Sequence, residues 1–374
     1  MKKIYLVYFI MMLSLLTLGG VSALVWGDRE FSANENRYLT QFPSFSWSEF
    51  VSVEWQDDMT NAFNDQFVQR DLWTQTATSV KKTLGNQDVG GVYIGKENYY
   101  FEKIMDQNIS QTNYFQNLRF VNILAKSQPK AEVSLMLVPS PGTILEEYLP
   151  KHATLYDSEK MYREAEDLLE EVTMIDLRNE FQEISKKRQI YYKTDHHWSL
   201  YGAYTGAMKY YEVMDESGKS YEEYGVKAVS NSFYGTLYSK ALDQKARPDE
   251  IDAPMELPPV KVYCDGKEKE SVYDNTKLEE KDQYAYFFGG NYGEVDIINE
   301  SAASQKKLLM IKDSFANSMV PFLMEDYVQI KMLDMRYYKG SLQELAETYG
   351  ADEVLVLYEM SNFAQDENLN KVIR

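Results

Sequence analysis

The stretch LLMIKDSFANSMVPFL, residues 308–323, joins an apolar run to a polar turn and then to a second apolar segment. The run 307–313 has the length and the unbroken hydrophobicity of a buried parallel strand, and we predict that residues 314–327 form the next helix. A serine between such a strand and a helix suits nucleophilic attack, because its own N–H can stabilise an oxyanion. The alternative is that Asp313 or Ser314 only caps the helix.

Strand-like and helix-like segments alternate on both sides of this stretch. Short apolar runs predict strands at residues 133–140, 172–177, 307–313, 328–334 and 352–360. Helical periodicity predicts helices at residues 47–84, 113–126, 158–171, 180–187, 199–214 and 341–349, and a short hairpin is expected at 92–101. This alternation favours an α/β fold in layers around a mostly parallel sheet.

Residues 215–304 interrupt the alternation. They are rich in Asp, Glu, Lys, Pro and Gly and show no clear period. We expect an irregular insertion with short antiparallel strands. Insertions of this kind in α/β folds often overhang the active face, so this one could supply part of a site.

The N-terminus carries an export signal. Lys2 and Lys3 precede an uncharged run, residues 4–26, which as a helix is long enough to cross a bilayer core. The lysines place the N-terminus in the cytoplasm. We therefore expect a signal anchor at residues 1–27 and an extracytoplasmic domain at 28–374. The alternative is a signal peptide cleaved after the small residues 21–23, which would release a secreted protein.

Composition limits the possible partners. The formal net charge of −19 would repel a nucleic-acid backbone, so we expect no nucleic-acid partner. Cys264 is the single cysteine, which excludes an internal disulfide. The 30 tyrosines fit sugar-like ligands, although packing at half-buried positions explains most of them.

A second polar cluster, Asp195-His196-His197-Trp198, holds two of the three histidines in the chain. Serine needs a base to take its proton; histidine is the natural one at neutral pH, and a carboxylate can hold its tautomer. An Asp two residues before a His can fold back onto the imidazole where the backbone turns. The alternatives are a surface role for each histidine, or a metal site with His152, which no metal-ligand spacing supports.

These motifs resemble the DHHW family. TDHHW at residues 194–198 is followed far downstream by KDSFAN at 312–317, and ENRYL, FNDQFVQRD, VYIGKENYYF, FGGNYGE and MLDMRYY also match in style. The family is related to the AlgX/AlgJ alginate O-acetyltransferases. The resemblance therefore implies an SGNH-hydrolase-like three-layer fold across nearly all of the chain after the anchor.

The resemblance implies Ser314 as nucleophile, His197 as base and Asp195 as its orienting acid. His197 is chosen over His196 because it directly precedes Trp198, as in the family's Asp-x-His-Trp pattern. The Asp-His pair comes before the Ser in the chain, the reverse of common SGNH enzymes. His196 and Trp198 are expected to shape the turn or to contact substrate.

Two further residues are candidates for oxyanion or substrate binding. Asn291 follows two glycines that would let the backbone approach a ligand, although it could equally be a turn residue. Arg336 could bind substrate, or it could simply pair with Asp334. The family's tyrosine after the serine has no counterpart, since residues 319–321 are Met, Val and Pro. The resemblance does not carry over a specificity for alginate.

The function implied is O-acetyl transfer to a cell-surface or secreted polysaccharide, without a cofactor or metal. Since acetyl-CoA is absent outside the cell, the resemblance implies an integral-membrane acyltransferase that supplies the acyl group. A carbohydrate esterase with the same triad is an alternative. A catalytically silent glycan-binding or scaffold protein is another.

Overall fold

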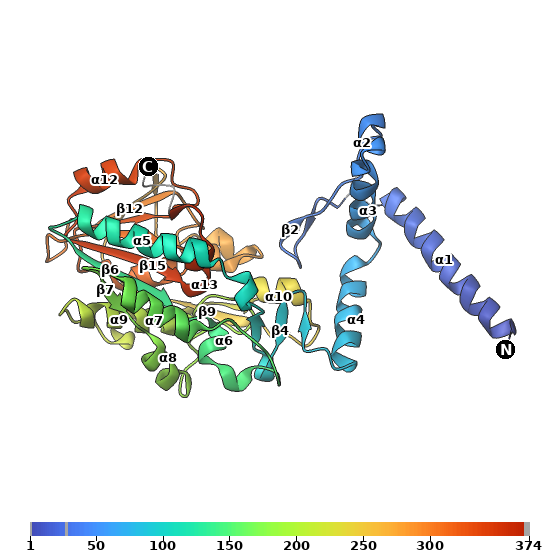
Figure 1. Ribbon diagram of the computed structural model, residues 1–374, viewed down its shortest axis with the longest axis horizontal. Helices are drawn as coiled ribbons and strands as arrows, with labels where there is room; N and C mark the ends of the chain where they lie inside the picture. Colours follow the sequence, from blue (N-terminus) through green and yellow to red (C-terminus); the bar gives the residue numbers. More distant parts are fainter. Residues whose placement is uncertain (1, 27–28, 370–374) are drawn as a thin grey trace. The chain divides into compact units, whose positions relative to one another are not determined.

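The computed structural model describes residues 2–26 and 29–369 (Figure 1). The chain divides into two compact units, each considered by itself. Unit 1 contains Met1–Gly90 and Tyr238–Ala246, and unit 2 contains Gly91–Leu237 and Arg247–Arg374. The expected division into a signal anchor at 1–27 and one domain at 28–374 stays a prediction.

Unit 1 is mostly helical. Its elements are α1 (Lys2–Trp26), β1 (Phe31–Ser32), β2 (Arg37–Tyr38), α2 (Trp47–Val51), α3 (Glu54–Gln66), α4 (Arg70–Thr83) and β3 (Asp88–Val89). The predicted helical region 47–84 is therefore present, but left-handed residues at Val53 and Gln69 break it into three helices.

Helix α1 is long and apolar enough to cross a membrane over Ile4–Ser22, by length and composition alone. Most of its large apolar side chains are exposed. Near the end of α1, the ring of Phe67 packs directly against Gly19. A Cβ at Gly19 would lie 2.3 Å from the Phe67 Cζ, so a larger residue would clash with this ring. An anchor and a signal sequence are both compatible with such a helix.

Unit 2 is built on one eight-stranded sheet within the described residues. Its strands are β6 (Glu132–Val138), β7 (Thr173–Ile175), β10 (Lys261–Cys264), β11 (Lys267–Lys269), β12 (Glu294–Ile298), β13 (Lys307–Lys312), β14 (Gln329–Leu333) and β15 (Glu353–Glu359). The spatial order is β11-β10-β12-β14-β13-β15-β6-β7. Neighbours from β14 to β7 run parallel, and β11 to β14 pair antiparallel. The predicted mixed α/β fold with a mainly parallel sheet is confirmed.

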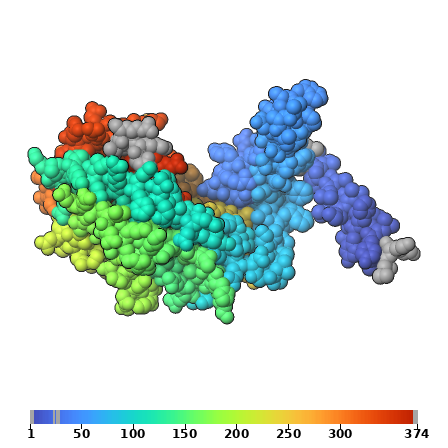
Figure 2. All heavy atoms as spheres, viewed as in Figure 1, coloured from blue at the N-terminus to red at the C-terminus, as the bar shows by residue number. Residues whose placement is uncertain are grey.

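Helices cover both faces of this sheet. The helices of unit 2 are α5 (Gln111–Ser127), α6 (Pro141–Ile144), α7 (Ser158–Leu168), α8 (Arg178–Ser185), α9 (Leu200–Val213), α11 (Ala316–Met319), α12 (Leu342–Tyr349) and α13 (Met360–Gln365). One apolar core contains α5, α7, α12 and α13, and the other contains α8, α9 and α11. The side chains of α5 and α7, teal and green in Figure 2, cover the face of unit 2 that is seen there.

Strand β13 lies at a switch point of the chain order. The chain leaves β13 for β14 on one side and then returns past it to β15 on the other. The connecting segments α11 and α12 belong to opposite apolar cores. In parallel sheets of this kind, ligands bind outside the carboxyl ends of the strands at such a point. Ser314 follows directly after the carboxyl end of β13.

The prediction of one long helix over residues 314–327 is wrong. The chain forms only α11 and then a 3₁₀ turn at Val320–Phe322. Pro321 has no N–H to donate to the carbonyl of Asn317, so the α-helical ladder ends here and the backbone tightens. Ser314 therefore lies before a single helical turn.

The segment 215–304 is only partly separate from the main sheet. Strands β8 (Lys227–Phe233) and β9 (Asp249–Ala253) form an antiparallel pair of their own, whereas β10, β11 and β12 extend the main sheet. The helix α10 (Thr236–Ala241) follows β8, and β4 (Val92–Ile94) pairs antiparallel with β5 (Tyr100–Glu102) in the hairpin predicted at 92–101.

Buried tyrosines donate their hydroxyl groups to main-chain carbonyls. The Tyr162 hydroxyl lies 2.7 Å from the Leu137 oxygen, and the Tyr224 hydroxyl lies 3.0 Å from the Phe322 oxygen. Burial raises the pKa of the Tyr162 phenol well above its ordinary value, so it stays neutral. Such rings fill the core while their hydroxyl groups satisfy main-chain carbonyls.

Gly202 sets how closely α9 approaches the loop before it. A Cβ at this position would lie 2.3 Å from the Ile190 oxygen and 2.9 Å from the Trp198 Cβ. We predict that Gly202→Ala lowers the free energy of unfolding by about 1–3 kcal/mol, because the added methyl overpacks a closed contact. Urea unfolding measures this loss. The matched variant Glu212→Gly, at an exposed position of the same helix, should cost only about 1 kcal/mol through helix propensity, and equal losses in the two variants would contradict the steric argument.

Candidate active site

Three side chains predicted to act together form one hydrogen-bonded chain. The His197 Nε2 lies 2.7 Å from the Ser314 Oγ, and the His197 Nδ1 lies 2.6 Å from the Asp195 Oδ1. All three residues are buried. The serine comes from the end of β13 and the other two from the loop before α9, so the sheet and a helix on one face jointly position them.

The carboxylate of Asp195 accepts hydrogen bonds from two segments. Its Oδ1 accepts the His197 backbone N–H at 3.0 Å, in the folded-back turn that the sequence predicts. Its Oδ2 accepts the Thr236 backbone N–H at 2.8 Å and the Thr236 hydroxyl at 3.0 Å. His196 completes the turn, because its Nδ1 lies 2.8 Å from the same hydroxyl. The sequence did not indicate Thr236, which lies in the segment without periodicity.

The imidazole of His197 is fixed by an aromatic ring that sequence reasoning also missed. The ring of Tyr284 stacks on it with a centroid distance of 3.8 Å and an interplanar angle of 13°. The Tyr284 hydroxyl donates to the main-chain carbonyl oxygen of Ser314 at 3.1 Å and lies 3.0 Å from the Ser318 Oγ. A single tyrosine therefore braces both the histidine and the serine. No periodic signal surrounds it in the sequence.

Trp198 is completely buried under the loop that carries Asp195 and His197. Its indole N–H donates to the Phe315 oxygen at 3.0 Å and to the Ser318 Oγ at 2.9 Å. The ring thus ties the histidine loop to the turn after β13. Its position indicates a structural role and leaves no surface for substrate contact.

Asp313 holds the turn around Ser314 from the other side. Its Oδ1 accepts the Phe315 N–H at 2.9 Å, and its Oδ2 accepts the Glu359 N–H and the Asn362 amide, both at 2.9 Å. Asp313 thus closes a turn at Phe315 but does not cap α11, which has no side-chain cap hydrogen bond, and the Ser314 hydroxyl points to His197. Among the described residues, no acceptor takes the Ser314 N–H.

The two candidate oxyanion residues lie in a polar network next to the turn that carries Ser314. Asn291 is exposed and its Oδ1 accepts the Asn317 amide at 3.1 Å, so it is linked to the helix after Ser314. The Arg336 guanidinium binds the Asp334 carboxylate through Nε at 2.8 Å and Nη2 at 2.6 Å, the pairing considered as an alternative.

Lys312 contacts both parts of this polar network. It is buried, and its Nζ lies 2.8 Å from the Asn317 Oδ1 and 3.8 Å from the Asp334 Oδ2. Burial lowers the pKa of Lys312 to about 8, because the charged ammonium loses its hydration. This lysine joins the two polar pairs that end in Asn291 and Arg336.

The electrostatics suit a neutral base beside an ionised acid. Burial, followed by the charge of His196, lowers the pKa of His197 to about 4, although Asp195 acts in the opposite direction. Burial alone would raise the pKa of Asp195, but His196, His197 and Thr236 together bring it well below its ordinary value. At neutral pH the imidazole is therefore free to accept a proton.

The structure gives little support to the alternative of a metal site formed with His152. The donor atoms of Asp195, His196 and His197 lie within 4.8 Å of one another, and His152 is not among them. Both ring nitrogens of His197 already make hydrogen bonds, to Asp195 and to Ser314. An ion would have to break the chain that links the three residues.

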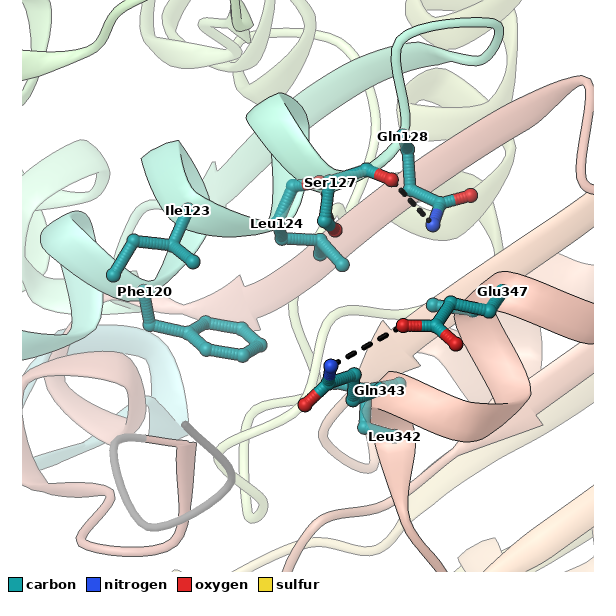
Figure 3. A pocket seen from close by; sticks show the side chains of 9 residues that line it. Phe120, Ile123, Leu124, Ser127, Gln128, Leu342, Gln343 and Glu347 are labelled. Carbon is teal, nitrogen blue, oxygen red and sulfur yellow. Dashed lines mark hydrogen bonds between the residues drawn. The ribbon is translucent and has the colours of Figure 1, made fainter. Parts of the chain in front are cut away.

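The apolar groove between α5 and α12 is separate from this site. It encloses about 400 Å³ between Phe120 and Leu124 of α5 and Leu342 and Ala346 of α12 (Figure 3). None of the residues of the hydrogen-bonded chain lines it.

Solved structures with TM-scores above 0.6 share this architecture. A DHHW family protein from Eubacterium siraeum superposes with a TM-score of 0.65 and 19% identity, over 76% of this chain and 95% of that one. The structure of Bacillus cereus PatB1 with a sulfonyl adduct gives a TM-score of 0.62 and 20% identity, over 76% and 98%. The O-acetyltransferase domain of Pseudomonas putida AlgJ gives 0.42 and 14%, over 75% and 95%.

No curated protein sequence matches the chain. The family model described as DHHW protein matches residues 143–333, which is more than half of the sequence. The matched range contains the Asp195-His196-His197-Trp198 motif and Ser314. The chain belongs to the DHHW family.

Proposed function

We propose that this protein is an O-acyltransferase that moves an acyl group, most simply acetyl, onto a hydroxyl of an extracytoplasmic polysaccharide. The observation that supports it is the unbroken chain from the Asp195 carboxylate through His197 to the Ser314 hydroxyl. A serine so connected to a neutral imidazole is an activated nucleophile. PatB1, which shares the fold, has been seen with a sulfonyl adduct, the kind of product that a nucleophilic side chain forms.

The reaction proceeds in two steps. His197 takes the Ser314 proton as the hydroxyl attacks the acyl carbonyl, and then returns that proton to the leaving group of the donor. The resulting acyl-serine is attacked by a sugar hydroxyl, whose proton His197 accepts and passes to the Ser314 oxygen as the ester bond breaks. Asp195 keeps Nε2 directed at the serine throughout.

Charge develops on the carbonyl oxygen in both steps. The Ser314 N–H makes no hydrogen bond to a described residue, so it is available to that oxygen. The single turn of α11 gives it only weak support from a helix dipole. Further donors are expected from the network of Asn291 and Arg336, which begins within one helical turn of the serine.

The N-terminal helix supports a location at the membrane. Ile4–Ser22 could hold the protein as a signal anchor beside an integral-membrane acyltransferase that delivers the acyl group. We propose this arrangement, with the polysaccharide as acceptor and unit 2 outside the cytoplasm. Release after signal cleavage would leave the same chemistry without the anchor.

Ser314→Ala should abolish acyl-enzyme formation, because the nucleophile is lost while its surroundings stay. The experiment is intact-protein mass spectrometry after exposure to 4-nitrophenyl acetate, with O-acetyl groups on the cell-surface glycan measured in parallel. Ser318→Ala is the matched control, since its hydroxyl binds Trp198 and Tyr284 and not His197. An acylated Ser314→Ala protein would contradict the assignment. Acyl-serine consumed by water alone, whatever glycan is added, would indicate an esterase, and no acyl-serine in the wild type would indicate a silent scaffold.

The acid limb of activity should lie near the low pKa of His197. Since the neutral imidazole is the active form, kcat/KM for acylation should be flat near neutrality and fall as the pH drops through about 4. His196→Asn removes the neighbouring positive charge, so the pKa of His197 should rise and the limb should move to higher pH. Stopped-flow measurement of 4-nitrophenol release across a range of pH gives the acid limb of the wild type and that of His196→Asn. A wild-type limb near the ordinary histidine value of about 6.5, or a limb that His196→Asn leaves in place, would contradict this reading.

Gly235→Ala should lower turnover without unfolding the protein. A Cβ at Gly235 would lie 2.3 Å from the Asp195 Cβ and 2.4 Å from its Oδ2, so the acid must move. A displacement of this size can cost about a hundredfold in rate. The assay is ester turnover beside circular dichroism, with the exposed Asn231→Ala as control. Full activity in Gly235→Ala would show that the position of Asp195 does not matter.

A further inference from the structure

A second cavity opens at the carboxyl edge of β13, β14 and β15, where the chain order switches. It encloses about 320 Å³. The residues that line it are Asp313, Arg336, Tyr358, Asn362, Gln365, Asp366, Glu367 and Asn368. Asp313 directly precedes Ser314, so the cavity lies against the turn that carries this serine. Of the residues that line this cavity, the mechanism described above uses only Arg336.

Tyr358, at the end of β15, presents an unsatisfied polar group in the wall of this cavity. Its side chain is 1% exposed, and its hydroxyl has no hydrogen-bond partner among the described residues. Burial raises the pKa of the Tyr358 phenol well above its ordinary value, and the carboxylates of Asp366, Asp334 and Asp313 raise it further. The phenol is therefore neutral and can both donate and accept. A buried polar group without a hydrogen bond costs free energy, so a ligand that bonds to this hydroxyl would be stabilised.

The charges around the cavity select the kind of ligand. The carboxylates of Asp366 and Glu367 and the amides of Gln365 and Asn368 come from the segment after β15. Among the described residues of the wall, Arg336 is the cation, and two of its nitrogens already bind the Asp334 carboxylate. The remaining Nη1 makes no hydrogen bond to a described residue. Hydroxyl groups can donate to the carboxylates and accept from Nη1, whereas an anionic ligand would meet uncompensated negative charge.

We propose that this cavity is the acceptor subsite of the acyl transfer proposed above, and that it binds a neutral glycan through its hydroxyl groups. The Tyr358 hydroxyl and the Arg336 Nη1 contact the sugar, and the carboxylates of Asp366 and Glu367 accept hydrogen bonds from its hydroxyl groups. This inference rests on the proposed function and adds the class of acceptor. Polyuronates and other anionic polymers are poor acceptors in this arrangement.

Tyr358→Phe tests the role of the hydroxyl. It keeps the edge-on contact with Phe363, whose ring centroid lies 5.9 Å away. Since nothing in the protein bonds the hydroxyl, the urea midpoint should not fall, while the KM for a neutral acceptor should rise about five- to tenfold, the worth of one hydrogen bond. Acylation by 4-nitrophenyl acetate should stay unchanged. Tyr162→Phe is the matched control, because its hydroxyl bonds the Leu137 oxygen: it should lower the urea midpoint and leave the acceptor KM alone.

The acceptors are hexasaccharides of glucan, mannan and chitin type, against hexagalacturonic acid as the anionic probe. The measured quantity is the rate at which acyl-Ser314 is discharged onto sugar, read by mass spectrometry. Gln365→Lys adds a positive charge at an exposed position of the wall. It should lower the ratio of the discharge rate onto neutral hexasaccharides to the rate onto hexagalacturonic acid about tenfold. Gln343→Lys on α12, which also lines a cavity but not this one, should not change it.

The outcomes separate this proposal from the function on which it rests. Failure of the wild type to form acyl-Ser314 would overturn the proposed function. If acyl-Ser314 forms, the subsite is overturned by an equal or higher rate with hexagalacturonic acid, by the absence of discharge onto any neutral hexasaccharide, or by an unchanged acceptor KM in Tyr358→Phe.

Discussion

The buried carboxylate of Asp195 is the constraint on which the site depends. It accepts hydrogen bonds from the backbone and ring of His197 and from the backbone and hydroxyl of Thr236. A buried ionised carboxylate is costly unless it is fully bonded, so the two segments that supply these donors must stay together for the protein to fold. The hydrogen bonds that hold the irregular segment after β8 to the loop before α9 thus also orient the His197 imidazole.

The rest of the site is held by rigid elements. Ser314 and Asp313 follow β13 in the middle of the parallel sheet, and Trp198 and Tyr284 clamp the turn around them. Because strand ends move little and the supporting rings are buried, the reacting groups need little reorganisation. The same strand ends form the cavity at Tyr358, so nucleophile and proposed acceptor subsite share one scaffold.

The sequence predicted those parts that local chemistry specifies. Continuous apolar runs mark β6, β13, β14 and β15, and Asp195, His197 and Ser314 are the residue types that acyl transfer requires. The helix after Ser314 was overestimated, because Pro321 stops a ladder that the apolar pattern alone would continue. Thr236 and Tyr284 could not be found, since their roles come from tertiary contacts over long sequence separations in a segment without periodicity. Tyr358 resembled any other core residue of a buried strand until its missing partner could be seen.

The tyrosines of the core have a consequence for behaviour in alkali. Burial raises the pKa of Tyr162, Tyr191 and Tyr210 well above the ordinary value of these phenols. The unfolded chain would lose these protons above about pH 10, whereas the folded chain retains them. Base therefore favours the unfolded state increasingly once that pH is passed. Many rings would then ionise together as the core opens, so that phenolate absorbance would report the loss of the fold as one cooperative event.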